Sequence, residues 1–402
     1  MTGGQGARRP RDPRLDVFRG LAMFIIFVAH VPFNPWNNWI PAAFGPSDAT
    51  ELFVFCSGMA SALAFGALFR DRSFALGLAR TAQRVWQVYW AHITLFLVCV
   101  AMLALFDELR GETFYTIRLY TRPFFEDTAP HLIGLMTLRY VPNYFDILPM
   151  YLVILAMMPF VAFVGLRSRW AAFALLGAVW LLAQFGLLAF GAEVRVGNER
   201  EWFFNPFGWQ LIFFVGFSFM MGWIKPPPRS MRLAAVALAI VALGLLFGSR
   251  FGWNTFDFVD DVRSAAPWLF WKTDLGIFRV VHFLALAYLC WLAVGERGRR
   301  LSGSGPAGKA VDVVRKVGQQ SLAVFVSSMV LAQAMGAALD YTPERGPVAV
   351  AAANLSGFAI LIGLAYVVAW FKAQPWRREA PVERVVAERR QAEARHAEGA
   401  IA

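Results

Sequence analysis

One stretch near the N-terminus joins an apolar run to side chains that could do chemistry. Residues 12–36 read DPRLDVFRGLAMFIIFVAHVPFNPW, with Asp16 and Arg19 at one end of the run and His30 near the other. Imidazole is suited to acid–base catalysis near neutral pH, and the guanidinium fork is suited to binding phosphate. If this run is one helix, these two kinds of chemistry lie at its opposite ends.

An acid follows the histidine after a short loop. Glu51 opens the next apolar run, so the two runs are predicted to be antiparallel neighbours with His30 and Glu51 at a similar depth. A carboxylate that orients an imidazole makes it an effective base toward a hydroxyl group. We therefore expect His30 to be a general base assisted by Glu51. The alternative is two unrelated polar groups at a membrane surface.

Two more arginines approach the level of Arg19. Arg80 and Arg84 lie in LARTAQRVWQVYWAH, at the start of the third apolar run. Taken singly, each arginine could simply anchor a span at the membrane surface. Several arginines that converge form a site for phosphate groups, and we expect these three to do so.

Further polar side chains within or beside the apolar runs are candidates for a functional site. Arg279 and His282 lie one turn apart in LGIFRVVHFLALAY, and ionisable residues within a span usually face a polar cavity. Asp48, in PSDATE, is expected mainly to cap a helix, with substrate binding as its second role. The uncharged members, which either cap helix starts or line a cavity, are Asn205, Trp209 and Gln210.

The elements that carry these residues are predicted to be transmembrane helices. The 402 residues are 58% hydrophobic and only 16% charged, a composition typical of a polytopic all-α membrane protein. A helix needs about 20 apolar residues to cross the hydrocarbon core. Ten such runs cover residues 15–33, 50–69, 85–106, 147–165, 170–190, 207–224, 231–248, 277–295, 320–339 and 348–371.

The distribution of basic residues predicts the orientation of these spans. Most of the 38 Lys and Arg residues fall in segments that share a side with the N-terminus, which predicts that both termini are cytoplasmic. The net charge of +11 is therefore a topology signal and not a sign of nucleic-acid binding. We expect a membrane domain over residues 1–371 and a charged cytoplasmic tail over residues 372–402.

Two other sequence patterns do not indicate a functional site. The three cysteines lie in apolar runs without metal-ligand spacing, so neither a metal site nor a permanently bound cofactor is expected. GSGPAG, residues 303–308, matches a dinucleotide-binding pattern, but no strand precedes it. We expect a flexible cytoplasmic linker there.

Together these stretches resemble one family, the OpgC-type succinyltransferases of osmoregulated periplasmic glucans, within the wider acyltransferase-3-like group. The resemblance runs in order through nearly the whole chain. It rests on RLDVFRGLAMFIIFVAH, DATELFVFCSGM, the segment from Arg80 to His92, FDILPMYLVILAMMP, NPFGWQLIFFVGF, LGIFRVVHFLALAY and GQQSLAVF.

This resemblance implies a ten-span enzyme of the bacterial inner membrane. It implies that succinyl-CoA binds from the cytoplasm as a co-substrate, with its phosphates at Arg19, Arg80 and Arg84, and that the acyl group passes to a hydroxyl of a periplasmic glucan. The candidates for binding the acyl group or its acceptor are then Arg279, His282, Asp48, Asn205, Trp209 and Gln210. His30 matches the histidine of span 1, Glu51 the acid after the first loop and Arg19 the arginine of the RG pair. The expected partners are therefore an acyl-CoA, a glucan and the lipid bilayer, and no oligomeric state is indicated.

Two other functions are open from the sequence. One is an O-acetyltransferase acting on another polysaccharide or a lipid head group. The other is a glycan transporter or flippase, in which intramembrane His and Arg would also occur. Many transporters have two matching halves, and we find no second copy of the RLDVFRG or TELFVFCSG stretch. For an acyltransferase, direct transfer and an acyl-histidine intermediate are both open.

Overall fold

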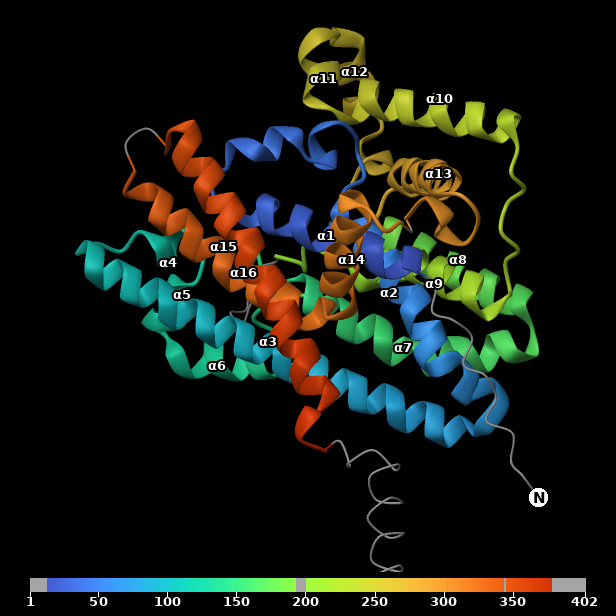
Figure 1. The fold of residues 1–402 in the computed structure, drawn as a ribbon, viewed down its shortest axis with the longest axis horizontal. Coiled ribbons are helices and arrows are strands. Elements are labelled where there is room, and N and C mark those ends of the chain that lie inside the picture. Colours follow the sequence, from blue (N-terminus) through green and yellow to red (C-terminus); the bar gives the residue numbers. More distant parts are fainter. Residues whose placement is uncertain (1–12, 193–199, 302, 343–344, 378–402) are drawn as a thin grey trace, which may run out of the picture.

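The computed structural model is a bundle of helices (Figure 1). Among the residues that it describes there is no β-strand, which confirms the all-α prediction. The structure describes residues 13–192, 200–301, 303–342 and 345–377, so most of the predicted tail lies outside it.

Long apolar helices make up most of the bundle. Seven helical segments of the described chain are long and apolar enough to cross a membrane, which confirms a polytopic membrane protein. They are Ala49–Arg72, α3 (Phe74–Arg110), α7 (Ile147–Arg167), α10 (Met231–Gly248), α13 (Ile277–Val294), α15 (Ser321–Asp340) and α16 (Pro347–Ala373).

The other three predicted spans are also helical but shorter or more charged. α8 (Arg169–Gln184) and α9 (Pro206–Met221) are shorter apolar helices, and α1 (Pro13–His30) carries Arg14, Asp16 and Arg19. The number of spans and the side of the termini stay predictions.

The second span changes its helical geometry along its length. It begins as α2 (Ala49–Ser61) and continues as two π-helical segments, η3 (Ala62–Gly66) and η4 (Leu68–Arg72). π-Helical turns within α-helices are frequent at functional sites. Residues of η3 line the cavity described below.

The core lies around α9. Its Trp209, Phe213, Phe214 and Phe217 are fully buried. α9 also touches α2 through the backbone, because a Cβ added at Gly58 would overlap the carbonyl oxygen of Phe213. Such close approach of two helices is the usual role of small residues in membrane bundles.

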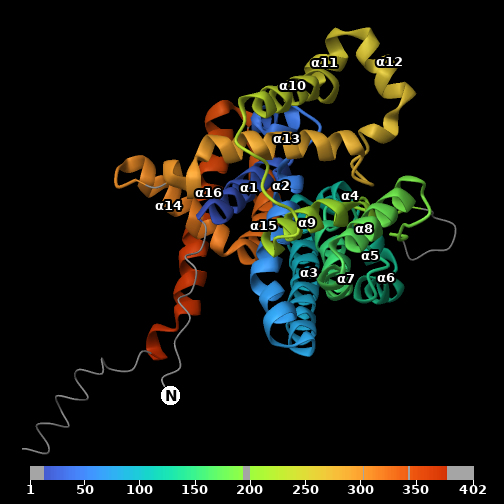
Figure 2. The same ribbon diagram turned by 90° about the vertical axis from the view of Figure 1, so that its right-hand side faces the viewer.

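Shorter helices extend from two places in the bundle. α4 (Tyr115–Arg118), α5 (Arg122–Glu126) and α6 (Thr128–Met136) lie beside α3, where the Tyr89 hydroxyl donates to the carbonyl of Met136 at 2.8 Å. α11 (Arg250–Thr255) and α12 (Asp257–Ala265) project beyond α10 (Figure 2). Short 3₁₀ segments join the remainder, among them η1 (Pro35–Trp39), η2 (Pro41–Ala43), η5 (Pro267–Leu269), η6 (Glu296–Leu301) and η8 (Pro375–Arg377).

One helix replaces the expected linker. The prediction of a flexible segment is wrong from Pro306 onward, because α14 (Pro306–Gln319) begins there, with proline in the first helical turn, where it is well tolerated. α14 packs directly against α1. A Cβ at Gly20 would overlap the carbonyl of Val314, and one at Gly318 would overlap that of Asp16. The glycine after Arg19 is therefore needed for helix contact.

Candidate functional site

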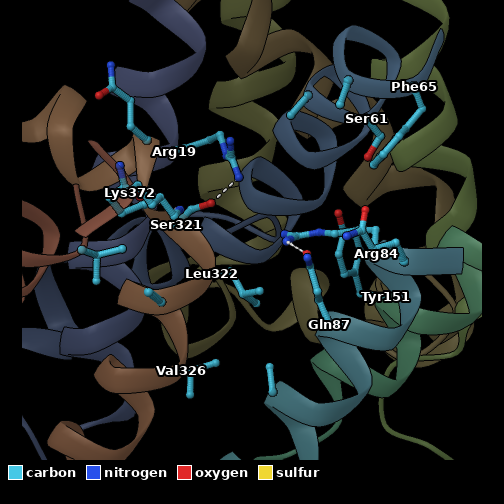
Figure 3. Close-up of a pocket in the computed structure, with 18 of the residues that line it drawn as sticks. Arg19, Ser61, Phe65, Arg84, Gln87, Tyr151, Ser321, Leu322, Val326 and Lys372 are labelled. Carbon is cyan, nitrogen blue, oxygen red and sulfur yellow. Dashed lines mark hydrogen bonds between the residues drawn. The ribbon is translucent and has the colours of Figure 1, made fainter. Parts of the chain in front are cut away.

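A cavity of about 740 Å³ lies at the Arg19 end of α1. Arg19, Arg80 and Arg84 all line it, so the structure brings the three predicted arginines together from α1 and α3. Figure 3 shows Arg19 and Arg84 in the lining. Lys372 of α16 is a fourth cation in the lining. None of the described residues that line it is acidic. The cavity is therefore electrostatically suited to an anionic ligand.

Amide and hydroxyl groups hold these cations in place. Arg80 donates to the Gln83 side chain at 2.6 Å, and Arg84 donates to that of Gln87 at 3.4 Å. These neutral acceptors orient the guanidinium groups without cancelling their charge. Phosphate oxygens are strong acceptors for such groups.

The junction between α14 and α15 forms one wall of the cavity. Gln319 donates to the Asp16 carboxylate at 3.4 Å, and the Gln320 side chain accepts from Lys372 at 2.7 Å. The Ser321 hydroxyl accepts from Arg19. The first turn of α15 also lines the cavity, and a helix N-terminus favours negative charge.

His30 ends α1, roughly 16 Å along the helix axis from Arg19. Its Nδ1 lies 2.7 Å from the carbonyl oxygen of Ile26. A carbonyl only accepts, so Nδ1 carries the proton of the neutral ring and Nε2 keeps its lone pair. Tyr144 packs edge-on against the imidazole at 5.2 Å between ring centroids. The ring is thus held in the tautomer that a base acting through Nε2 requires.

Tyr144 is itself tightly constrained. Its φ is +98°, a region that residues other than glycine rarely occupy, and its hydroxyl donates to the carbonyl of Met329 on α15 at 2.5 Å. Backbone strain of this kind persists only where the surroundings enforce it, and it clusters at functional sites. Tyr144 therefore links α15 to the histidine.

Glu51 does not contact His30 in the structure, contrary to the expectation from sequence. One carboxylate oxygen accepts from Arg279 Nη2 at 2.5 Å and from its Nε at 2.8 Å. The other accepts from the backbone N–H of Asp48 at 2.8 Å. Glu51 is fully buried, and a buried carboxylate requires a paired cation. Arg279 supplies it, and the Ile26 carbonyl orients the imidazole instead.

Asp48 caps α2, as predicted, and has a second partner. Its carboxylate accepts from the Thr50 N–H at 2.7 Å and from Lys272 Nζ at 2.5 Å. Burial alone would raise the pKa of Asp48, but the neighbouring Lys272 and Arg279 outweigh this and hold it below the usual range. Asp48 is thus ionised at neutral pH.

The uncharged candidates make hydrogen bonds within the protein. Asn205 caps α9 through the Phe207 N–H at 3.0 Å, which is one of its two predicted roles. Trp209 donates to the carbonyl of Lys272 at 2.9 Å, and Gln210 to that of Leu176 at 2.9 Å. Trp209 and Gln210 are fully buried, so these groups fix the backbone around the site.

His282 of α13 packs where the loop before α2 and helix α10 approach it. Its Nδ1 lies 2.6 Å from the Ser47 hydroxyl, before α2. Gly45 and Gly244 leave the space that its ring fills, since a Cβ at either would overlap the imidazole. Of the predicted pair on α13, Arg279 therefore binds Glu51 and His282 binds Ser47. Neither lines the cavity at the Arg19 end.

Comparison with known proteins assigns the family. The family model described as OpgC protein matches residues 11–373. The chain belongs to the OpgC family. No curated protein and no solved structure matches it. Membership in the OpgC family gives this membrane protein a role in modifying osmoregulated periplasmic glucans, as an acyltransferase-type enzyme.

Three residues beside the cavity or the histidine of this OpgC protein were not predicted from its sequence to be functional. Lys372 follows the last apolar run, where a basic residue usually marks a membrane boundary. Lys272 and Tyr144 lie in loops, and nothing in the sequence places either beside α1. The nearest signal for Lys272 is that it is the one lysine in the long loop over residues 249–276.

Proposed function

We propose that this protein is an inner-membrane enzyme that moves a succinyl group from cytoplasmic succinyl-CoA to hydroxyl groups of periplasmic glucans. The observation that supports this most directly is the arrangement along α1. A cavity whose charged lining residues, within the described part of the chain, are all cationic lies at its Arg19 end, and an imidazole with an available Nε2 lies at the other.

The phosphates of the CoA would bind at Arg19, Arg80, Arg84 and Lys372. Its long uncharged arm would then follow α15, because Val326 and Ser327 also line the cavity. The next turn of α15 carries Met329, whose carbonyl binds Tyr144 beside His30. The wall of the cavity therefore leads from the cations toward the histidine.

At His30 the reaction is a direct acyl transfer. Nε2 takes the proton of the sugar hydroxyl as its oxygen attacks the thioester carbonyl. The carbon–sulfur bond then breaks, an ester forms, and the imidazolium returns the proton to the CoA thiolate. The Ile26 carbonyl holds the ring throughout, while Glu51 acts at a distance by fixing Arg279 and the start of α2.

The experiment uses the purified full-length protein in proteoliposomes with succinyl-CoA and a β-glucan. Mass spectrometry of the recovered glucan should show added succinyl groups that depend on both the protein and the donor. Empty liposomes and free CoA in place of the thioester are the controls. A glucan that stays unmodified although the protein in the proteoliposomes is folded would refute the proposed function.

A further inference from the structure

The loop over residues 272–275 is held by more hydrogen bonds than a simple connection requires. Its four residues are bonded by side chains of α8, α9 and the cap of α9. The bonds run from Trp209 Nε1 to Lys272 O (2.9 Å) and Thr273 O (3.1 Å), from Asn205 Nδ2 to Asp274 Oδ1 (2.8 Å), from Gln184 Nε2 to Asp274 O (2.6 Å) and from Trp180 Nε1 to Leu275 O (3.1 Å).

The same loop holds a strained backbone. Leu275 has a φ of +56°, in the left-handed region that disfavours a branched side chain. Gly208 of α9 lies against it so closely that an added Cβ would overlap the Asp274 carbonyl. Strain of this kind persists where surrounding contacts fix it, and it marks positions where placement matters. The residue that this loop carries toward α1 and α2 is Lys272.

The Lys272 ammonium has hydrogen-bonding capacity left over. It has three N–H donors, and its hydrogen bond within the described chain goes to Asp48 at 2.5 Å. Its side chain is 30% exposed, and Nζ lies 5.7 Å from the centre of the Phe204 ring. Arg279, by contrast, is 8% exposed and bound to the fully buried Glu51. Of these two cations, Lys272 is the accessible one.

Lys272 is bound to the start of the α-helix that follows His30 in the chain. His30 ends α1, and residues 31–48 lead from it to α2, which packs against α1 and whose cap, Asp48, binds the Lys272 ammonium. An acyl group whose thioester carbon sits at His30 would bring any distal charge into this region. A distal carboxylate would bind the Lys272 ammonium there, while a short neutral acyl group such as acetyl carries no charge for the ammonium to bind.

We propose that Lys272 is a specificity-determining residue that binds the distal carboxylate of a dicarboxylic acyl group as its thioester reaches His30. This inference rests on the proposed acyl transfer. It assigns to Lys272 the role that the sequence suggested for Arg279. Asp48 keeps the ammonium in position, and one of its remaining N–H groups binds the acyl carboxylate.

The test compares two donors, succinyl-CoA and acetyl-CoA, in the parent protein and in Lys272→Met. A charge-assisted hydrogen bond predicts that the variant loses about tenfold to a hundredfold in kcat/KM with succinyl-CoA. Its kcat/KM with acetyl-CoA should stay within about twofold of the parent, because no distal charge is present. Lys272→Arg keeps the cation and should retain the preference for succinyl-CoA.

Loss of Lys272 alone would leave the partly buried Asp48 carboxylate without its ion-pair partner, so Lys272→Met combined with Asp48→Asn is made in parallel. Asparagine still caps a helix, and the pair of changes removes both charges together. The double variant should show the same loss of preference. Arg122→Gln is the control for removing a cation elsewhere in the protein, because Arg122 is exposed and pairs with Glu126.

Each result has one interpretation. An equal loss with both donors, or no loss with either, would overturn the role of Lys272 while leaving the acyl transfer of the parent intact. A parent protein that does not use succinyl-CoA would overturn the proposed function and this inference together.

Discussion

Arg279 on α13 and Glu51 on α2 form a buried ion pair, with Nη2 2.5 Å from Oε1 and the carboxylate fully shielded from solvent. The second oxygen of Glu51 closes the capping box of α2 through the Asp48 N–H. One carboxylate therefore joins two helices and fixes the start of the segment that carries Asp48. Arg279 and Glu51 act on the site by holding its frame.

Breaking this pair should destabilise the protein strongly. Glu51→Gln leaves a buried guanidinium without a counter-charge, which typically costs about 3–5 kcal/mol. Thermal unfolding of the purified protein in detergent should show a large drop in Tm. Glu51→Gln combined with Arg279→Met removes both charges and should recover part of it. A single variant as stable as the parent would contradict this account of the pair.

Contact between α1 and α14 should depend on Gly20. Alanine there overlaps the Val314 backbone, so Gly20→Ala should push α14 away and displace Arg19. We expect a lower Tm and weaker binding of acyl-CoA, measured by calorimetry. Gly177→Ala is the matched control, because Gly177 is also helical but faces open space, where alanine favours the helix by about 1 kcal/mol. Equal effects of the two substitutions would contradict the backbone contact.

Removing cations from the cavity should weaken donor binding without slowing chemistry. Arg80→Gln and Arg84→Gln should each raise the KM for succinyl-CoA by about tenfold, the usual effect of one lost charge-assisted contact. Their kcat should change little. Arg169→Gln, at an arginine that packs on Trp170 outside the cavity, provides the control. If kcat falls while KM stays constant, these arginines do not bind the donor.

Asp146 should make stability depend on pH. Burial raises the pKa of Asp146 to about 7, against an opposing effect of the Arg200 charge. In the unfolded chain this carboxyl has a pKa of about 4. The folded state therefore binds the proton more tightly than the unfolded state, and the difference shows in the pH range between the two pKa values. Stability should therefore fall as pH rises from about 4 to 7 and then level off, by roughly 4 kcal/mol at about 1.4 kcal/mol per pKa unit.

Asp146→Asn removes this titration. The difference in Tm, variant minus parent, should be larger at pH 8 than at pH 5. Both proteins are measured in one detergent at constant ionic strength. A difference between variant and parent that does not change with pH would show that Asp146 titrates at its ordinary value.

The long apolar helices were predictable because their signal is local. A run of about 20 apolar residues is long enough to cross the bilayer as a helix. The predicted convergence of the arginines of α1 and α3 is also seen, since they line one cavity. The cap at Asp48 was also predictable, since it depends on residues 48–51 alone. α14 was missed because GSGPAG, residues 303–308, was interpreted as a flexible linker, whereas Pro306 within it begins the helix.

The partners of the polar residues could not be predicted, because they depend on which helices meet. The spacing of residues 30 and 51 fits a contact between His30 and Glu51 as well as it fits the observed pair with Arg279. The partner of Glu51 is determined by the packing of α13, which is more than 200 residues away along the chain. Lys272 likewise reaches the site only through the bonds that α8 and α9 make to its loop.

The most direct test of the account is the rate of acyl transfer by His30→Gln, measured beside His131→Gln. His131 has the same local geometry as His30, with Nδ1 2.6 Å from the Asp127 carbonyl and an edge-on contact with Tyr140, but it lies on α6. Loss of a general base typically lowers the rate by about 10² to 10⁴. We predict that loss in His30→Gln with unchanged binding of succinyl-CoA and unchanged Tm, and the parental rate in His131→Gln. A folded His30→Gln protein that transfers succinyl groups at the parental rate would contradict the account.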